Sequence, residues 1–303
     1  MLVSLSLALL ACGTTTPRRA APRVAPLTRP TASRPAASRP AAPAPKYPRH
    51  RIFASAADAL DAILSTSPRV IGFGEYHQKT DSARVVSPLK RFTTQMLDHL
   101  AEQVSDLVVE LAMPVGACEG GQENKVAKKV EKTTKRPPAT ENEAALLLGR
   151  ARRLGIRPHI LLLSCKEYSE LLGGEDVDYQ KLLTILTQKL ADKAREALSR
   201  PVRFDDKGEL RNLVLLYGGA LHNDLFPRRY MEDYSYAARL SKLAGGRYVE
   251  VDLYVPEYIE GDETLSKESW YPLRRHAAKG HVVLIERAAR SYILLLQRGA
   301  VAP

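Results

Sequence analysis

Short apolar runs alternate with amphipathic helical patterns over most of the chain, and this alternation constrains the fold more than any other feature. Seven runs have the length and composition of buried strands: Val70–Phe73, Leu107–Leu111, His159–Leu163, Leu213–Tyr217, Tyr248–Leu253, Val282–Ile285 and Tyr292–Leu296. Helical patterns separate several of them: Ser55–Leu64, Pro88–Val104, Thr140–Leu154, Tyr179–Leu198 and Tyr230–Leu243. The alternation predicts an α/β fold, a mainly parallel sheet with helices on both faces.

The predicted folded part, residues 52–303, has the length of one α/β domain. Its last two apolar runs are joined around Ala288–Arg290, so we expect an antiparallel hairpin at the C-terminal edge of the sheet. Residues 119–138 interrupt the pattern with Lys, Glu, Gly, Thr and a Pro-Pro pair. That composition predicts a mobile surface insertion.

The N-terminal residues 1–12 are typical of a lipoprotein signal peptide. Met1–Ala11 is uncharged and mostly apolar, and it is too short to span a bilayer. Leu9-Leu10-Ala11-Cys12 resembles the lipobox at which bacterial lipoproteins are cleaved and acylated on Cys12. No Lys or Arg precedes the apolar stretch, so we expect the natural start to lie further upstream. The sequence thus predicts a lipid-anchored protein of the bacterial cell envelope, in the periplasm or on the outer surface.

Residues 13–51 are rich in Pro, Ala, Arg and Ser and contain no acidic residue, which predicts a disordered tether. Nine of the 45 Lys and Arg residues lie there, which leaves 36 against the 34 Asp and Glu residues of the rest. This near balance argues against a nucleic-acid-binding domain. The basic tether is either a segment attracted to anionic lipid or envelope polymers, or a plain soluble spacer.

Two cysteines remain once Cys12 is lipidated. In an oxidising compartment Cys118 and Cys165 are either joined as one disulfide or left as two unpaired thiols. The pair lacks the CxxC spacing of a metal site, so we do not expect it to bind metal.

Two motifs of the form Gly-x-x-His follow predicted strands, Gly74-Glu75-Tyr76-His77 and Gly219-Ala220-Leu221-His222. Open parallel sheets bind ligands beyond the carboxyl ends of their strands. A third predicted strand carries Glu110 among apolar neighbours, where a carboxylate is costly unless it is paired or bound to a metal. These residues predict a site for Zn²⁺, Mn²⁺, Co²⁺ or a similar cation. The alternative is an ion pair of Glu110 with an Arg and histidines bonded to backbone.

This set of motifs resembles the superfamily that groups Tiki-type metalloproteases, TraB/GumN-like proteins, erythromycin esterase-like enzymes and ChaN-like haem-binding lipoproteins. Its members show a Gly-Glu-x-His or Gly-x-x-His after the first strand, a Glu on the next strand and a later Gly-x-x-His. Residues 74–77, Glu110 and residues 219–222 match in that order, within roughly 69–252.

The resemblance implies two different functions. The Tiki-type role makes His77, His222 and Glu110 metal-site residues, with Glu75 as ligand or general base and a cation-activated water as nucleophile. The ChaN-like role, which a lipid anchor favours, implies haem binding with Tyr76 as an iron ligand. The basic insertion and the Pro/Arg tether depart from typical ChaN-like proteins.

We therefore expect a metal-dependent hydrolase, peptidase-like or esterase-like, with Glu75 and Glu110 as catalytic residues. Haem or iron binding is the first alternative, and a non-catalytic interaction module of the envelope is the second. Asp224 lies two residues after His222 and is either a partner that orients that imidazole or a helix cap. The sequence leaves the oligomeric state open.

Overall fold

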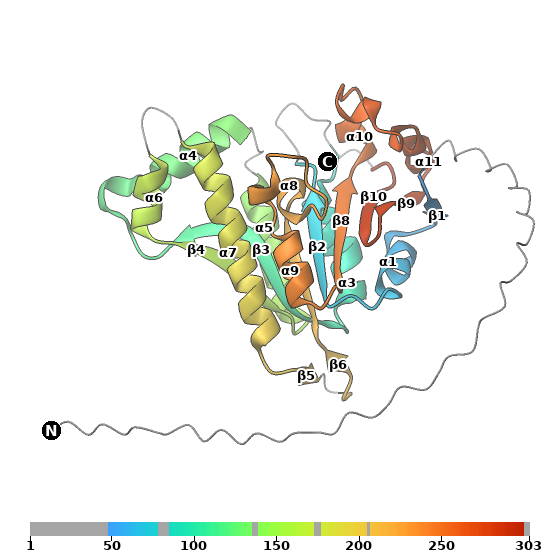
Figure 1. Ribbon diagram of the computed structural model, residues 1–303, viewed down its shortest axis with the longest axis horizontal. Coiled ribbons are helices and arrows are strands. Elements are labelled where there is room, and N and C mark those ends of the chain that lie inside the picture. Colours follow the sequence, from blue (N-terminus) through green and yellow to red (C-terminus); the bar gives the residue numbers. More distant parts are fainter. Residues whose placement is uncertain (1–47, 78–84, 135–138, 173–176, 205–206, 300–303) are drawn as a thin grey trace, which may run out of the picture. The chain divides into compact units, whose positions relative to one another are not determined.

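A central sheet with helices on both faces forms the framework of the structure (Figure 1). The computed structural model describes residues 48–77, 85–134, 139–172, 177–204 and 207–299. They belong to one compact unit that spans Pro45–Pro303. Within these residues the main sheet has eight strands in the order β1-β9-β10-β8-β2-β7-β3-β4.

The predicted α/β fold is confirmed, because each of the seven predicted strands is present and the five pairings from β10 to β4 are all parallel. The antiparallel β9-β10 pair lies one strand in from the edge, which β1 forms. The strands of the main sheet are β1 (His50–Phe53), β2 (Val70–Glu75), β3 (Val104–Pro114), β4 (Arg157–Leu163), β7 (Leu213–Gly219), β8 (Tyr248–Tyr254), β9 (Val282–Ala288) and β10 (Ser291–Leu295). A separate small sheet pairs β5 (Arg203–Phe204) with β6 (Leu210–Arg211).

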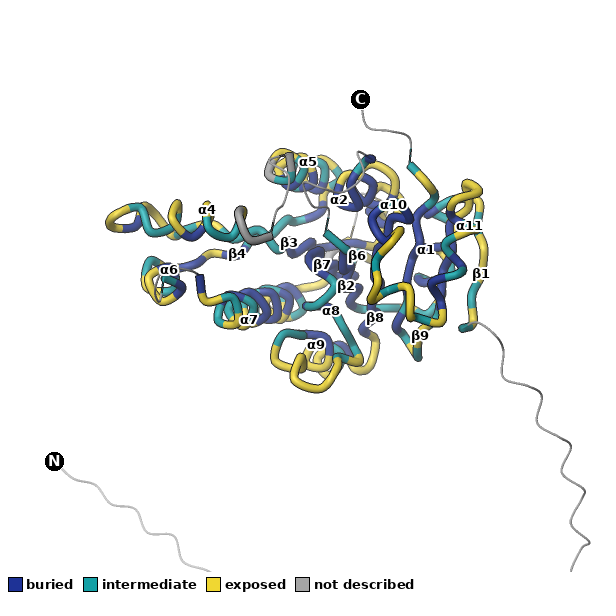
Figure 2. Tube along the Cα trace, turned by 90° about the horizontal axis from the view of Figure 1, so that it is seen from above, coloured by how far each residue is buried: buried dark blue, intermediate teal, exposed yellow. Residues whose placement is uncertain are grey.

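The helices flank the sheet in two layers (Figure 2). On one face α1 (Ala56–Leu64), the continuous run α2 (Pro88–Arg91), η1 (Phe92–Met96) and α3 (Leu97–Leu100), and α5 (Ala139–Arg153) bury apolar side chains against the sheet. On the other face the same is true of α7 (Tyr179–Ser199) and α9 (Ala237–Leu243), while α4 (Gln122–Thr134) and α6 (Cys165–Leu171) pack against each other and add apolar side chains to the same cluster. A third apolar cluster packs α10 (Pro256–Ile259), η5 (Tyr271–Leu273) and α11 (Arg274–Ala278) against β9 and β10. The short elements η2 (Glu119–Gly121), α8 (Ala220–Asn223), η3 (Glu232–Tyr234) and η4 (Leu265–Lys267) complete the chain.

The fold begins earlier than the predicted boundary at Ile52. His50 and Arg51, placed in the tether by their basic surroundings, form the start of β1 and pair with Ile285 and Leu284 of β9. A strand this short carries no periodicity of its own, and its pairing with β9 is what defines it.

The segment predicted as a mobile insertion, residues 119–138, contains η2 and α4, and its last residues, 135–138, lie outside the described residues. Val126 is buried in the second core, and Val130, four residues later, packs against it. The Tyr179 hydroxyl also lies 3.4 Å from the carbonyl oxygens of Lys129 and Val130. Two valines four residues apart form the apolar face of this helix. In the sequence, the many lysines and glutamates around them obscure that spacing.

The predicted helix over Tyr230–Leu243 is only half correct. Tyr230 has a positive φ of 75°, and Ser235 is extended, so η3 and α9 are separate elements. No helix among the described residues is long and apolar enough to cross a membrane.

Candidate active site

Three of the parallel strands bring the predicted site residues together at their carboxyl ends. Strands β2 and β7 are neighbours, and their register places Glu75 opposite Gly219. His77 follows β2, and His222 lies in α8, which follows β7 directly. Open α/β sheets bind ligands beyond these carboxyl ends. Residues 78–84, which follow His77, lie outside the described residues.

Glu75 and His77 form a hydrogen-bonded pair. The Nδ1 atom of His77 lies 2.6 Å from Oε1 of Glu75, and the Tyr217 hydroxyl donates to Oε2 of the same carboxylate at 2.5 Å. An ionised carboxylate only accepts, so this network assigns the neutral-imidazole proton to Nδ1 and turns Nε2 toward Gly219. Glu75 is 7% exposed and His77 is 30% exposed, so solvent reaches the imidazole but scarcely reaches the carboxylate.

Glu110 reaches the same place because β3 bulges. Val108 pairs with His159 of β4, but the next pair joins Ala112 to Leu161, so extra residues on β3 surround Glu110. The Oε2 atom of Glu110 accepts a hydrogen bond of 2.7 Å from the backbone N–H of Gly219. Bulges of this kind commonly re-aim a side chain beside a functional site.

His222 is held by residues of α7 and η3. Its Nδ1 atom lies 2.8 Å from the Thr187 hydroxyl and 3.0 Å from the carbonyl oxygen of Tyr234. Thr187 in turn donates to the carbonyl of Leu183 at 2.8 Å. Because a carbonyl oxygen only accepts, this network also assigns the proton to Nδ1. The Nε2 atom then faces Oε1 of Glu110 at 3.7 Å.

Gly74 of β2 and Gly218 and Gly219 of β7 leave space for other groups. A Cβ on Gly219 would lie 2.8 Å from Nε2 of His77, and one on Gly218 would lie 2.5 Å from Oε2 of Glu110. A Cβ on Gly74 would lie 2.6 Å from the Cα of Ala220. Gly74 therefore admits the backbone of α8.

The donor set matches a cation site in part. His77, His222 and Glu110 are ligand types that Zn²⁺ or Mn²⁺ accepts, and each Nδ1 bonds a protein oxygen, as metal-binding histidines commonly do. As the side chains stand, however, the described residues contain no group of three or more His, Cys, Asp or Glu placed to hold a metal ion. The metal centre stays a prediction.

Three site residues were not predicted from the sequence: Tyr217, Thr187 and Glu143. Tyr217 lies on the strand that carries the second motif, two residues before Gly219, which is the only local signal for it. Glu143 of α5 accepts a hydrogen bond of 2.5 Å from the Ser87 hydroxyl. Burial, and then the nearby charge of Glu75, raise the pKa of the Glu143 carboxyl.

Tyr76 points away from these residues. Its hydroxyl donates to Asp262 at 2.6 Å, and its ring stacks on Tyr254 with centroids 5.8 Å apart. Burial and the Asp262 carboxylate raise the pKa of Tyr76 to about 12. A phenolate, the form that ligates iron, is thus disfavoured, and haem binding stays a prediction without support from this geometry.

Asp224 does not orient His222. Its side chain accepts a hydrogen bond of 2.9 Å from the N–H of Phe226, and it lies 3.7 Å from Arg287. It ends α8 rather than capping the helix that follows. Thr187 and the Tyr234 carbonyl do the orienting instead.

Of the two possible states of Cys118 and Cys165, the structure contains the disulfide, with Cα atoms 5.2 Å apart. It joins the chain just before η2 to the first residue of α6. The predicted lipidation site Cys12 and the tether up to residue 47 lie outside the described residues.

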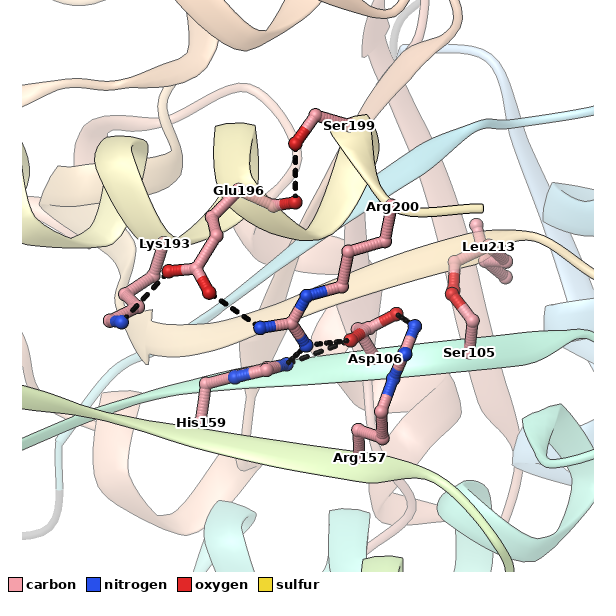
Figure 3. A network of polar contacts seen from close by, with 9 residues as sticks. All are labelled: Ser105, Asp106, Arg157, His159, Lys193, Glu196, Ser199, Arg200 and Leu213. Carbon is pink, nitrogen blue, oxygen red and sulfur yellow. Dashed lines mark hydrogen bonds and ion pairs between the residues drawn. The ribbon is translucent and has the colours of Figure 1, made fainter. Parts of the chain in front are cut away.

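A second histidine–carboxylate cluster lies near the opposite end of β3 and β4 (Figure 3). Asp106 is fully buried and accepts from Arg157 and His159 at 2.8 Å each and from Arg200 at 3.3 Å. Burial alone would raise the pKa of Asp106, but hydrogen bonds from His159, Arg157 and Ser105 outweigh it and lower the pKa to about 2. Two arginines neutralise this carboxylate, which makes the cluster a structural ion pair.

No protein-family model and no curated protein matches the sequence. Among solved structures, the type III effector HopBA1 is similar with a TM-score of 0.41 and 13% identity, over 83% of this chain and 98% of that chain. A protein from Bacillus cereus has a TM-score of 0.38 and 8% identity, over 85% and 97%. A succinoglycan biosynthesis protein has a TM-score of 0.32 and 10% identity, over 65% and 68%. Similarities this weak carry no argument about function.

Proposed function

We propose that the protein is a hydrolase in which His77 acts as the general base. The observation that carries this proposal is the 2.6 Å contact between Nδ1 of His77 and Glu75, whose other oxygen accepts from Tyr217. A carboxylate in this position fixes the imidazole tautomer and stabilises the imidazolium that forms when Nε2 accepts a proton. The partial exposure of His77 supports access by water and substrate.

Hydrolysis of an ester, amide or similar bond is the reaction class that these groups support. Nε2 of His77 would take the proton of an attacking water, and Glu75 would hold the ring in place during that transfer. Glu143, a carboxyl with a raised pKa near Glu75, has the chemistry of a proton donor to the leaving group.

The test is turnover of a panel of chromogenic ester, peptide and phosphoester substrates by the full chain. We expect His77→Ala to lower kcat about 10²- to 10⁴-fold, the usual contribution of a general base. Tyr217→Phe, which removes the hydroxyl that donates to Glu75, should lower kcat about tenfold.

His99→Ala is the matched control, because His99 also pairs with a carboxylate, Asp61 at 2.7 Å, but on the surface of α3. This variant should keep wild-type turnover. Unchanged turnover in a folded His77→Ala variant would show that the proposed base is wrong. No turnover of any substrate by the wild type would favour the non-catalytic module.

A second candidate is a metal-dependent hydrolase, and the geometry of His222 favours it. With the proton on Nδ1, Nε2 of His222 lies 3.7 Å from Oε1 of Glu110, so a nitrogen and an oxygen of the types that divalent cations bind face each other. His77, His222 and Glu110 would hold a divalent cation. When bound, such an ion supplies Lewis-acid polarisation and lowers the pKa of water.

Elemental analysis separates the two candidates. The full chain is purified without chelators or affinity metals, and its Zn, Mn and Co content is measured beside that of His222→Ala, Glu110→Gln and the control His99→Ala. Stoichiometric metal that is lost only in the first two variants would establish the metal-dependent form. Active protein without metal would leave general-base catalysis, and a Soret band after haem addition would favour haem binding instead.

We propose also that the protein is lipid-anchored in the cell envelope. The Cys118–Cys165 disulfide supports this, because such bonds persist in oxidising compartments outside the cytosol. Membrane fractionation of the wild type and Cys12→Ser tests it. We expect the wild type in the membrane fraction and the variant in the soluble fraction, and identical fractionation would contradict the anchor.

A further inference from the structure

Strand β8 carries a row of polar side chains in the middle of the sheet. Tyr248, Glu250 and Asp252 alternate along the strand and are 0%, 0% and 3% exposed. The intervening Val249, Val251 and Leu253 belong to the apolar core of the opposite face. Polar groups this deeply buried are costly unless each has a partner. We call Tyr248, Glu250 and Asp252 the β8 row.

All three members of the β8 row bond to the turn from Asn223 to Leu225, which follows His222 at the end of α8. The Tyr248 hydroxyl donates to the carbonyl of Asn223 at 2.8 Å, and Asp252 accepts from Nδ2 of Asn223 at 3.2 Å. Glu250 accepts from the N–H of Leu225 at 2.9 Å. The row thus holds the chain at Asn223 and Leu225, one and three residues after His222.

Strand β2 makes room for this arrangement. Gly72 and Gly74 lie opposite Glu250 and Asp252 in the sheet register. A Cβ on Gly72 would collide with the Tyr248 hydroxyl and lie 3.0 Å from the Cβ of Asn223. The carbonyl of Gly72 also accepts from Nδ2 of Asn223 at 3.0 Å. Two glycines on one strand and three polar residues on the next therefore form one seat for α8.

Arg287 of β9 neutralises much of the charge of this seat. It forms an ion pair with Glu250, lies 3.4 Å from Asp252 and donates to the Ser291 hydroxyl at 3.2 Å. Burial raises the pKa of both carboxyls despite this partner. The partners of both carboxylates are Arg287 and the chain that follows His222, and these contacts offset part of the cost of burying them.

We propose that Tyr248, Glu250 and Asp252 are positioning residues that set the place of His222 relative to Glu110. Thr187 and the Tyr234 carbonyl orient the imidazole ring, whereas the β8 row sets the backbone from which the ring extends. This inference rests on the proposed function of His222 as a site residue. A shift of the turn would change the 3.7 Å separation between Nε2 of His222 and Glu110.

The test is NMR spectroscopy of the full chain labelled with ¹⁵N-histidine, which reads the Nδ1 and Nε2 shifts of His222 directly. The His222 signals are assigned by their loss in His222→Gln. We expect Tyr248→Phe and Asp252→Ala to shift both His222 signals. Asp252→Asn should restore them, because an amide oxygen still accepts from Asn223.

Tyr254→Phe is the control, a buried tyrosine further along β8 that stacks on Tyr76 and not on the turn. It should leave the His222 signals unchanged. Wild-type His222 signals in folded Tyr248→Phe and Asp252→Ala would overturn the proposal. If Asp252→Ala fails to fold, Tyr248→Phe, which removes one oxygen atom, decides alone.

The NMR result does not depend on any substrate. Should the protein prove inactive, the positioning role stands or falls on the His222 signals alone. If turnover is found, Tyr248→Phe should lower kcat about tenfold or more with KM unchanged, because misplacement of a reacting group by an ångström has effects of this size.

Discussion

At the scale of single residues, two histidine–carboxylate clusters in one sheet have opposite electrostatics. The Asp106 carboxylate contacts two arginines as well as His159, so its charge is balanced and its pKa is lowered to about 2. Glu75 instead bonds a tyrosine hydroxyl and an imidazole. A carboxylate held by an imidazole and a phenol can stabilise positive charge that develops on the imidazole, which makes the second arrangement suited to proton transfer.

We expect Asp106→Asn to lower the free energy of unfolding by about 2 kcal/mol or more at pH 7, because Arg157 and Arg200 then lose their buried partner. The folded pKa lies below the unfolded value, so this contribution is present above the unfolded pKa and is lost as pH falls toward 2. Urea unfolding at pH 7 and pH 3 measures it. The difference between wild type and variant should shrink at pH 3, and an equal difference at both values would contradict the assignment.

Gly219 and Gly74 should respond differently to alanine. In Gly219→Ala the new methyl meets the end of the His77 side chain, which can rotate away, so stability should hold while turnover falls. In Gly74→Ala the methyl meets the backbone of Ala220, which cannot move away. We therefore expect this variant to lower the free energy of unfolding by about 1–3 kcal/mol. Thermal unfolding and turnover of the two variants, compared side by side, check this. The same phenotype in both would count against the separate roles.

At the scale of elements, apolar runs predict all seven long strands of the main sheet, because a buried strand needs little beyond a run of large apolar residues. The bulge in β3 is not predictable in this way. Val108 to Ala112 reads as an uninterrupted apolar strand around Glu110, and only the register against β4 shows the extra residues. The Gly-x-x-His motifs single out His77 and His222 as candidates, whereas Tyr217 and Thr187 become their partners only through tertiary packing.

The Cys118–Cys165 disulfide should stabilise the arm formed by α4 and α6. The two cysteines are 47 residues apart, so the crosslink restricts a long loop of the unfolded chain. We expect Cys118→Ser with Cys165→Ser to lower the free energy of unfolding by about 2–4 kcal/mol. Limited proteolysis should then cut within α4 before the central sheet. The wild type is first checked for the Cys118–Cys165 disulfide. Unchanged stability of the double variant would then contradict this expectation.

At the scale of the whole molecule, the strand order explains why sequence reasoning could place the candidate residues at the carboxyl ends of the strands but could not predict how they meet. Adjacent parallel strands end at the same side, which brings β2 and β7 together with β3 next to them. The order of strands in the sheet depends on long-range pairing that no local pattern records. For the same reason, the sequence of β8 predicts only a buried strand, and the role of the β8 row follows only from its hydrogen bonds to the chain at the end of α8.

The pH dependence of the whole molecule should reflect opposing buried carboxyls. Asp106 has a lowered pKa, so its contribution to stability is lost in acid. Burial and the neighbouring Glu250 raise the pKa of Asp252, so its protonated form is favoured in the fold and stability is lost as pH rises from the unfolded value toward the folded one. Because both carboxyls share the same unfolded pKa, we expect these two opposing effects to place a stability maximum at about pH 4.

Two variants separate the limbs of that pH profile. Asp252→Asn cannot ionise, yet its amide oxygen can still accept from Asn223, so it should flatten the loss of stability above the maximum and raise the melting temperature at pH 7. Asp106→Asn should flatten only the acid limb. Melting temperatures from pH 3 to pH 8 test both. A slope above the maximum that survives in Asp252→Asn would assign it to other groups, with Glu250, which shares Arg287, as the next residue to replace.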